Sequence, residues 1–223
     1  MFWPFSLTVA YNNVFVVDPG YTVPLLVCVA IALFLKRTST RRRWINGLGL
    51  VLSSAYMMLT LVCKYIAHER ITASLNRQGI TYSSLSTRPT PFNCILWSAT
   101  AVSDDHYDLT YYSLLDSKPE VEFVRFPKNR ELLGRWADDQ HVHRLIRLSA
   151  DNYVMQRRND TLVFCDLRFG QIGEPAPDKP FVFSYKLIPV GDELRVVLIP
   201  PPALDGEKFS TLTAELWARV KGE

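Results

Sequence analysis

Asp18 is the ionisable residue whose place in the chain points most directly to chemistry. It stands at the outer end of an apolar stretch with Asn12, Asn13 and Tyr21 close in sequence, so several polar groups could converge near a membrane surface. A carboxylate at membrane depth is costly and therefore informative. Asp18-Pro19-Gly20 is also a common helix start, in which the carboxylate caps free N–H groups. We therefore take Asp18 as a candidate functional residue, with helix capping as the structural alternative.

The pair His141-x-His143, beside Asp138 and Asp139, offers the ligand types of catalytic zinc. Residues two apart on a helix point to different sides, whereas the H-E-x-x-H motif places its histidines four apart. We expect a solvated helix face at this position and assign no metal ligand and no cofactor to this chain.

Charged residues elsewhere favour structural roles. His68 and His106 are isolated, and we expect Asp116 and the segment Asp166-Leu167-Arg168 to form ion pairs within the fold. Neither a G-x-S-x-G motif nor a glycine-rich phosphate loop occurs in the sequence. The sequence therefore offers no complete active site.

Two apolar stretches, residues 21–35 and 44–63, position Asp18 and predict a helical hairpin that crosses a bilayer. About 20 residues cross roughly 30 Å of hydrocarbon, and the second stretch meets that length. The first reaches it only if residues 14–20 lie at membrane depth or at the interface, which gives spans of about 14–35 and 44–63. Between them, residues 36–43 hold five basic side chains, which is typical of a cytoplasmic loop. Two buried helices of a soluble core are the alternative.

The basic loop also predicts orientation and compartment. With residues 36–43 in the cytoplasm, everything after residue 63 faces the other side, which is the periplasm for a bacterial inner membrane. The chain has a net charge of +3, which owes much to this loop, so we expect it to contact the headgroups of the lipid bilayer and not to bind nucleic acid. In that oxidising compartment Cys94 and Cys165 could pair, although their spacing alone cannot show proximity.

The composition changes after Lys64, and the rest of the chain predicts a soluble β-rich domain of residues 79–223. A stalk helix over 64–78 continues the second span, so that residues 1–78 form the membrane anchor. Short runs rich in aromatic and β-branched residues predict an antiparallel sheet, with two short helices at 130–137 and 140–148 packed on it. The expected strands cover 80–87, 94–102, 107–113, 121–126, 153–157, 161–166, 181–189 and 194–199, and a tail helix covers 211–220. The fold class is α+β.

Six segments in one order resemble the YdjM-like family of bacterial inner-membrane, metal-dependent hydrolases. They are Phe2-Trp3-Pro4-Phe5-Ser6, the run from Asn13 to Leu26, Thr90-Pro91-Phe92-Asn93, the run from Tyr111 to Asp116, Arg125-Phe126-Pro127-Lys128-Asn129 and Asp166-Leu167-Arg168-Phe169-Gly170. The resemblance implies an N-terminal multi-span part with His and Asp metal ligands, distantly similar to zinc phospholipase C and P1 nuclease. A hairpin and an outward-facing β-rich domain would follow that part.

The histidine motifs of this family would lie ahead of Phe2, so the resemblance implies that this chain holds the C-terminal part of such a hydrolase and is inactive by itself. Asp18 and Asn13 match positions that could reach the family's active site, so the resemblance makes them candidate catalytic residues. Zinc is the metal implied for full-length relatives, and the implied substrate is an envelope lipid or another phosphoester. The alternative from another class is a non-enzymatic, membrane-tethered protein that binds a partner or an envelope component. The oligomeric state is open.

Overall fold

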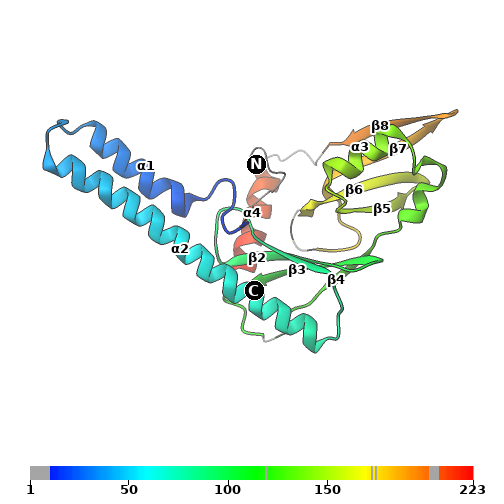
Figure 1. Ribbon diagram of the computed structural model, residues 1–223, viewed down its shortest axis with the longest axis horizontal. Coiled ribbons are helices and arrows are strands. Elements are labelled where there is room, and N and C mark those ends of the chain that lie inside the picture. Colours follow the sequence, from blue (N-terminus) through cyan, green and yellow to red (C-terminus); the bar gives the residue numbers. More distant parts are fainter. Residues whose placement is uncertain (1–10, 119, 172, 174, 201–205, 223) are drawn as a thin grey trace, which may run out of the picture.

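The computed structural model describes residues 11–222 except 119, 172, 174 and 201–205, and it has an α+β fold (Figure 1). A helical hairpin projects away from two four-stranded antiparallel sheets, and a C-terminal helix closes the chain. The segment Phe2-Trp3-Pro4-Phe5-Ser6, which contributes to the family resemblance, lies outside the described residues.

The hairpin consists of α1 (Pro19–Leu33) and α2 (Thr40–Arg77), which pack side by side. Helix α1 begins at Pro19, because Asp18 has extended backbone angles and caps it, as the capping alternative predicts. Residues 14–17 of the predicted first span are therefore not helical. At about 1.5 Å per residue, the 15 residues of α1 extend only about 22 Å. The predicted loop 36–43 is also shorter than expected, since α2 begins at Thr40 and includes three of its arginines.

Helix α2 runs without a break from the apolar stretch into the predicted stalk, so that part of the prediction is confirmed. It is 38 residues long, and among the described residues it is the helix that is long and apolar enough to cross a membrane. It ends at Arg77 with Gln78 as its C-cap, and Gly79 follows with a φ of +67°, a left-handed conformation that glycine adopts at little cost.

The first sheet has the order β1-β2-β3-β4 and covers the lower part of α2. Its strands are β1 (Ser84–Pro89), β2 (Leu96–Val102), β3 (His106–Ser113) and β4 (Val124–Pro127). Ala67, Ile71 and Leu75 of α2 are fully buried against Trp97 and the alanines of β2. The stalk is therefore part of the core of this sheet, although we expected it to lie in the anchor.

The second sheet has the order β5-β6-β7-β8. The strands that we expected in one sheet therefore form two sheets. Those of the second sheet are β5 (Tyr153–Arg158), β6 (Thr161–Gln171), β7 (Phe181–Val190) and β8 (Glu193–Ile199). The 3-10 helix η1 (Arg130–Trp136) and α3 (Gln140–Leu148) pack on this sheet through Leu133, Val142 and Leu145. Packing of these helices on the first sheet, as we predicted, is wrong, because α2 and the second sheet already cover that sheet.

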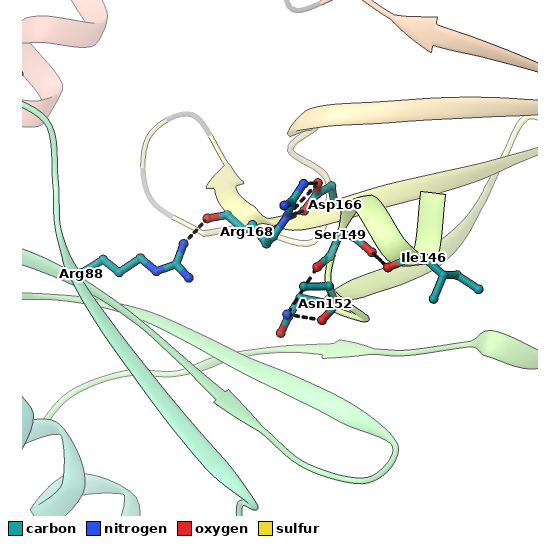
Figure 2. Close-up of polar contacts among 7 residues, drawn as sticks. Arg88, Ile146, Ser149, Asn152, Asp166 and Arg168 are labelled. Atoms are coloured by element: carbon teal, nitrogen blue, oxygen red, sulfur yellow. Dashed lines mark hydrogen bonds and ion pairs between the residues drawn. The ribbon is translucent and has the colours of Figure 1, made fainter. Parts of the chain in front are cut away.

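The two sheets share a core, which makes β3 buried on both of its faces. Tyr107 and Leu109 of β3 pack with Val154, Val163 and other residues of the second sheet. A polar contact also joins the sheets, since the Arg88 guanidinium of β1 donates a hydrogen bond of 2.9 Å to the Arg168 carbonyl of β6 (Figure 2).

Helix α4 (Gly206–Val220) returns to the first sheet beside the end of β3. The Ser113 hydroxyl donates to the Val220 carbonyl, and Arg219 forms an ion pair with Asp116 at 2.5 Å. This confirms the predicted structural role of Asp116.

Candidate functional site

The Asp18 carboxylate is 2% exposed and lies between the two helices of the hairpin. Its Oδ1 accepts a hydrogen bond from the Gly20 N–H at 2.9 Å, which is the capping geometry that Asp-Pro-Gly predicts. The Tyr56 hydroxyl of α2 lies 2.8 and 2.9 Å from Oδ1 and Oδ2 and donates to the carboxylate. Asp18 therefore joins the start of α1 to the middle of α2.

Asn13 lies next to this pair in the same hairpin and also contacts α2. Its side-chain amide donates to the Thr60 hydroxyl at 3.0 Å, and that hydroxyl in turn donates to the Met57 carbonyl at 2.8 Å. Asn13 and Thr60 are both buried. Both sequence-predicted site residues therefore bind α2. Their partners on that helix, Thr60 for Asn13 and Tyr56 for Asp18, are one turn apart.

Two thiols extend the polar group towards the first sheet. Cys94 lies in the segment before β2. Its thiol interacts with the Tyr56 hydroxyl and with the Cys63 thiol, both of α2. We call Asn13, Asp18, Tyr56, Thr60, Cys63 and Cys94 the junction cluster. It lies where the hairpin meets the sheet domain, and its donors are neutral.

A cavity of about 460 Å³ opens beside the junction cluster, between α2 and β1. Lys64 and His68 of α2 line one wall, and Ser86 and Thr87 of β1 line the other. The Lys64 ammonium donates a hydrogen bond to the carbonyl of Tyr11.

A second buried carboxylate, Asp108 of β3, lies away from the hairpin and has charged partners. Arg125 of β4 donates to both of its oxygens, at 2.9 and 3.2 Å. His106 Nε2 lies 3.1 Å from Asp108 Oδ2 but outside hydrogen-bond geometry, whereas His106 Nδ1 is 2.5 Å from the exposed Asp105. The hydrogen bond from His106 holds the pKa of the Asp105 carboxyl below its ordinary value.

The remaining sequence candidates have structural surroundings. His141 and His143 lie on the exposed face of α3, and Asp139 caps that helix by accepting from the His141 N–H at 2.7 Å. Asp166 and Arg168 form the expected ion pair, at 2.7 Å within β6 (Figure 2).

Cys94 and Cys165 are not paired, because they belong to different cores. Cys94 packs beside α2 with the first sheet, whereas Cys165 of β6 lies between the two sheets. Burial raises the pKa of the Cys165 thiol to about 11, so this thiol is poorly reactive.

The junction cluster does not fit a zinc ion. Zinc sites need three or four converging nitrogen, oxygen or sulfur ligands. Both oxygens of Asp18 already accept hydrogen bonds, and no group of three or more His, Cys, Asp or Glu residues that could hold a metal occurs in the part of the chain that the structure describes. The chemistry that the described residues support is therefore a buried, hydrogen-bonded carboxylate beside a phenol and two thiols.

Comparisons of the chain with family models, with curated proteins and with solved structures gave no match. The resemblance to the YdjM-like hydrolases therefore stays a prediction.

Tyr56, Thr60 and Cys94 were not predicted from the sequence as partners of the candidate residues. Tyr56 and Thr60 are four apart on α2 and so share one face with Cys63. A polar side chain repeated at that spacing inside an apolar stretch was the available signal. Nothing in the sequence indicated Cys94, because its approach depends on how the sheet packs.

Proposed function

We propose that this chain is a membrane-anchored envelope protein, in which the α1–α2 hairpin crosses the bacterial inner membrane twice and holds the two-sheet domain at its periplasmic surface. The observation that carries this proposal is the inverted arrangement of the hairpin. The polar side chains of Asp18, Ser53 and Thr60 are buried, while most of its large apolar side chains are exposed.

The exposed apolar surface covers both helices. On α1 it includes Val23, Leu26, Val27, Val29, Ile31 and Leu33, and on α2 it includes Trp44, Leu48, Leu50, Val51, Leu52, Met58, Leu59, Leu61 and Val62. Only 17% of the most apolar part of α2 is buried within the protein, which is not the environment of a core helix in a soluble fold. A continuous apolar surface of this kind needs a membrane or another partner to cover it, and the basic loop favours a membrane.

The start of α2 supports the orientation. Arg41, Arg42 and Arg43 occupy its first turn, where the helix dipole disfavours cations by about 0.3–1 kcal/mol each. Anionic lipid headgroups on the cytoplasmic side would offset that cost. Because α1 is short for a full span, residues 14–17, which include the exposed Val16 and Val17, would lie in the interface beside it.

The test is extraction of the full chain from isolated membranes with alkaline carbonate. We expect it to stay in the membrane pellet, and release into the supernatant would contradict the proposal. Val51→Arg combined with Leu59→Arg places charges on the lipid-facing surface, at about 2.5–3.5 kcal/mol each near the centre of a span, and should reduce insertion. Glu69→Arg, in the stalk, is the matched control and should leave insertion unchanged.

A second candidate function rests on the burial of Asp18 in the junction cluster. We propose that the chain is the C-terminal part of a metal-dependent hydrolase, as the family resemblance implies, and that Asp18 would help to form a site whose metal ligands lie in another part of the protein. The support is that a carboxylate is retained inside an apolar helix pair, where it is costly.

Two measurements test this second function. The 223-residue chain should bind no stoichiometric zinc and hydrolyse no phosphoester, and zinc binding that is lost on changing His141 and His143 would contradict this. In a protein that also carries the histidine motifs, Asp18→Asn should lower hydrolysis far more than stability. A purely capping role predicts a loss of at most about 1 kcal/mol in stability and unchanged hydrolysis, since Asn caps almost as well as Asp.

A further inference from the structure

The cavity between α2 and β1 combines a cation with neutral hydrogen-bond donors. Lys64 and His68 are one turn apart on α2, and the Thr87 hydroxyl belongs to the facing strand, on the same face as Leu85 and Ala99 of the core under α2. Thr87 is 4% exposed and both α2 residues are half-buried, so the polar wall is partly shielded from water. Ammonium, imidazole and hydroxyl groups are donors to phosphate oxygens.

The surroundings of the cavity carry a surplus of positive charge. Arg88, which follows Thr87 on β1, lies close enough for its charge to act on the Lys64 ammonium. None of the described residues that line the cavity bears a carboxylate. An anion bound there would therefore relieve repulsion between two cations as well as accept hydrogen bonds.

The position of the cavity along α2 indicates which anion it would meet. Lys64 directly follows the apolar stretch 44–63, and Leu61, which also lines the cavity, is exposed on the surface that we assign to lipid. Tyr65, an aromatic residue of the kind enriched at membrane interfaces, lies at the same level and is 67% exposed. A phosphate in the cavity would leave an attached acyl chain beside the apolar part of α2.

We propose that this cavity binds the phosphate of an anionic phospholipid headgroup, with Lys64 as the principal ligand and His68 and Thr87 as additional donors. The proposal rests on the membrane anchoring proposed above. The bound lipid fixes the height of the sheet domain above the bilayer, because one wall of the site belongs to the anchor helix and the other to the sheet.

The experiment titrates the full chain, in a neutral detergent, with water-soluble dihexanoyl phosphatidylglycerol and measures binding by calorimetry. Saturable binding is expected with the anionic lipid, and none with dihexanoyl phosphatidylcholine. Lys64→Gln should weaken binding by at least about tenfold, since a hydrogen bond to a charged group is lost. Lys64→Arg keeps the charge and should stay within about threefold of the unchanged protein.

Lys36→Gln is the matched control, because it removes one positive charge from the loop at the other end of the hairpin and should leave binding unchanged. Equal weakening by Lys36→Gln, or wild-type binding by Lys64→Gln, would overturn the proposal. Inorganic phosphate that binds as tightly as the lipid would show a site for free anions and would also overturn it. Failure of anchoring itself is seen separately, as release of the chain by carbonate.

Discussion

The two halves of α2 form one continuous helix but lie in opposite surroundings. Between residues 40 and 63 most large apolar side chains are exposed and the buried positions include Gly49, Ser53 and Thr60. Between residues 64 and 77 the pattern reverses, because Ala67, Ile71 and Leu75 are fully buried beneath the first sheet. The same helix thus changes from a surface suited to lipid to a protein core within about two turns.

The boundary between the proposed anchor and the sheet domain therefore falls inside a helix and not in a loop. A rigid helix transmits the position of the hairpin directly to the sheet, whereas a loop would uncouple them. The junction cluster lies at this boundary, and its hydrogen bonds join α2 to Asn13 and to Asp18 at the start of α1.

The largest expected effect on stability comes from truncating the chain either before or after residues 64–77, the lower half of α2. A fragment of residues 64–223 should fold, whereas a fragment of residues 79–223 loses Ile71 and Leu75 and leaves Trp97 uncovered. Each large buried side chain contributes about 2–5 kcal/mol, so the free energy of unfolding should fall by at least about 4 kcal/mol. Urea unfolding followed by tryptophan fluorescence checks this, and equal midpoints would show that the sheet does not depend on the stalk.

A pair of single substitutions sharpens the same comparison. Ile71→Ala should lower the stability of the sheet domain by about 2–4 kcal/mol, because it leaves a cavity in a closely packed core. Leu59→Ala, at a side chain that is 50% exposed, should change it by less than about 0.5 kcal/mol. Thermal melting of both variants in detergent measures the difference, and similar losses would mean that the upper half is also packed against protein.

Most helices and strands could be predicted from the sequence, because the local pattern of apolar and polar residues was strong there. All eight strands and the order of the helices were predicted, because β-branched and aromatic runs ended at clear turn signals. The division into two sheets was not predicted, since strand pairing across residues 128–152 depends on tertiary packing. Asp18 was found because a charge beside an apolar stretch is conspicuous, but the thiol of Cys94 and the Asp108–Arg125 pair depend on contacts between separate segments.

Glycine positions test how closely the upper half of α2 packs on α1. A Cβ at Gly49 would lie 2.7 Å from the Cβ of Cys28, whereas a Cβ at Gly47 meets nothing within 4 Å. Gly49→Ala should therefore destabilise the hairpin by about 1–3 kcal/mol. Gly47→Ala should stabilise it by up to about 1 kcal/mol through helix propensity. Unfolding by sodium dodecyl sulfate, followed by circular dichroism, separates these outcomes, and equal shifts would argue against close helix contact.

The smallest expected effect concerns pH in the sheet domain. The pKa of Asp105 is lowered in the folded state by its hydrogen bond from His106. The stabilisation from this carboxylate is therefore present above its unfolded pKa and is lost as the pH falls through the lower folded value. Asp105→Asn should lower the melting temperature at pH 7 and have less effect at pH 3. The neighbouring Asp104→Asn is the control. If the loss in melting temperature caused by Asp105→Asn grew as the pH fell, the lowered pKa of Asp105 would be contradicted.

The most direct test of the account is the topology of the hairpin, measured with alkaline phosphatase, which is active only in the periplasm. Fused after Lys118, between β3 and β4, the reporter should be active, and fused after Thr38, between α1 and α2, it should be inactive. That pair of results places the sheet domain and the basic loop on opposite sides of the membrane, as two crossings and the positive-inside rule require. An inactive reporter after Lys118 together with an active one after Thr38 would contradict the orientation, and equal activity at both positions would contradict the crossing by α2.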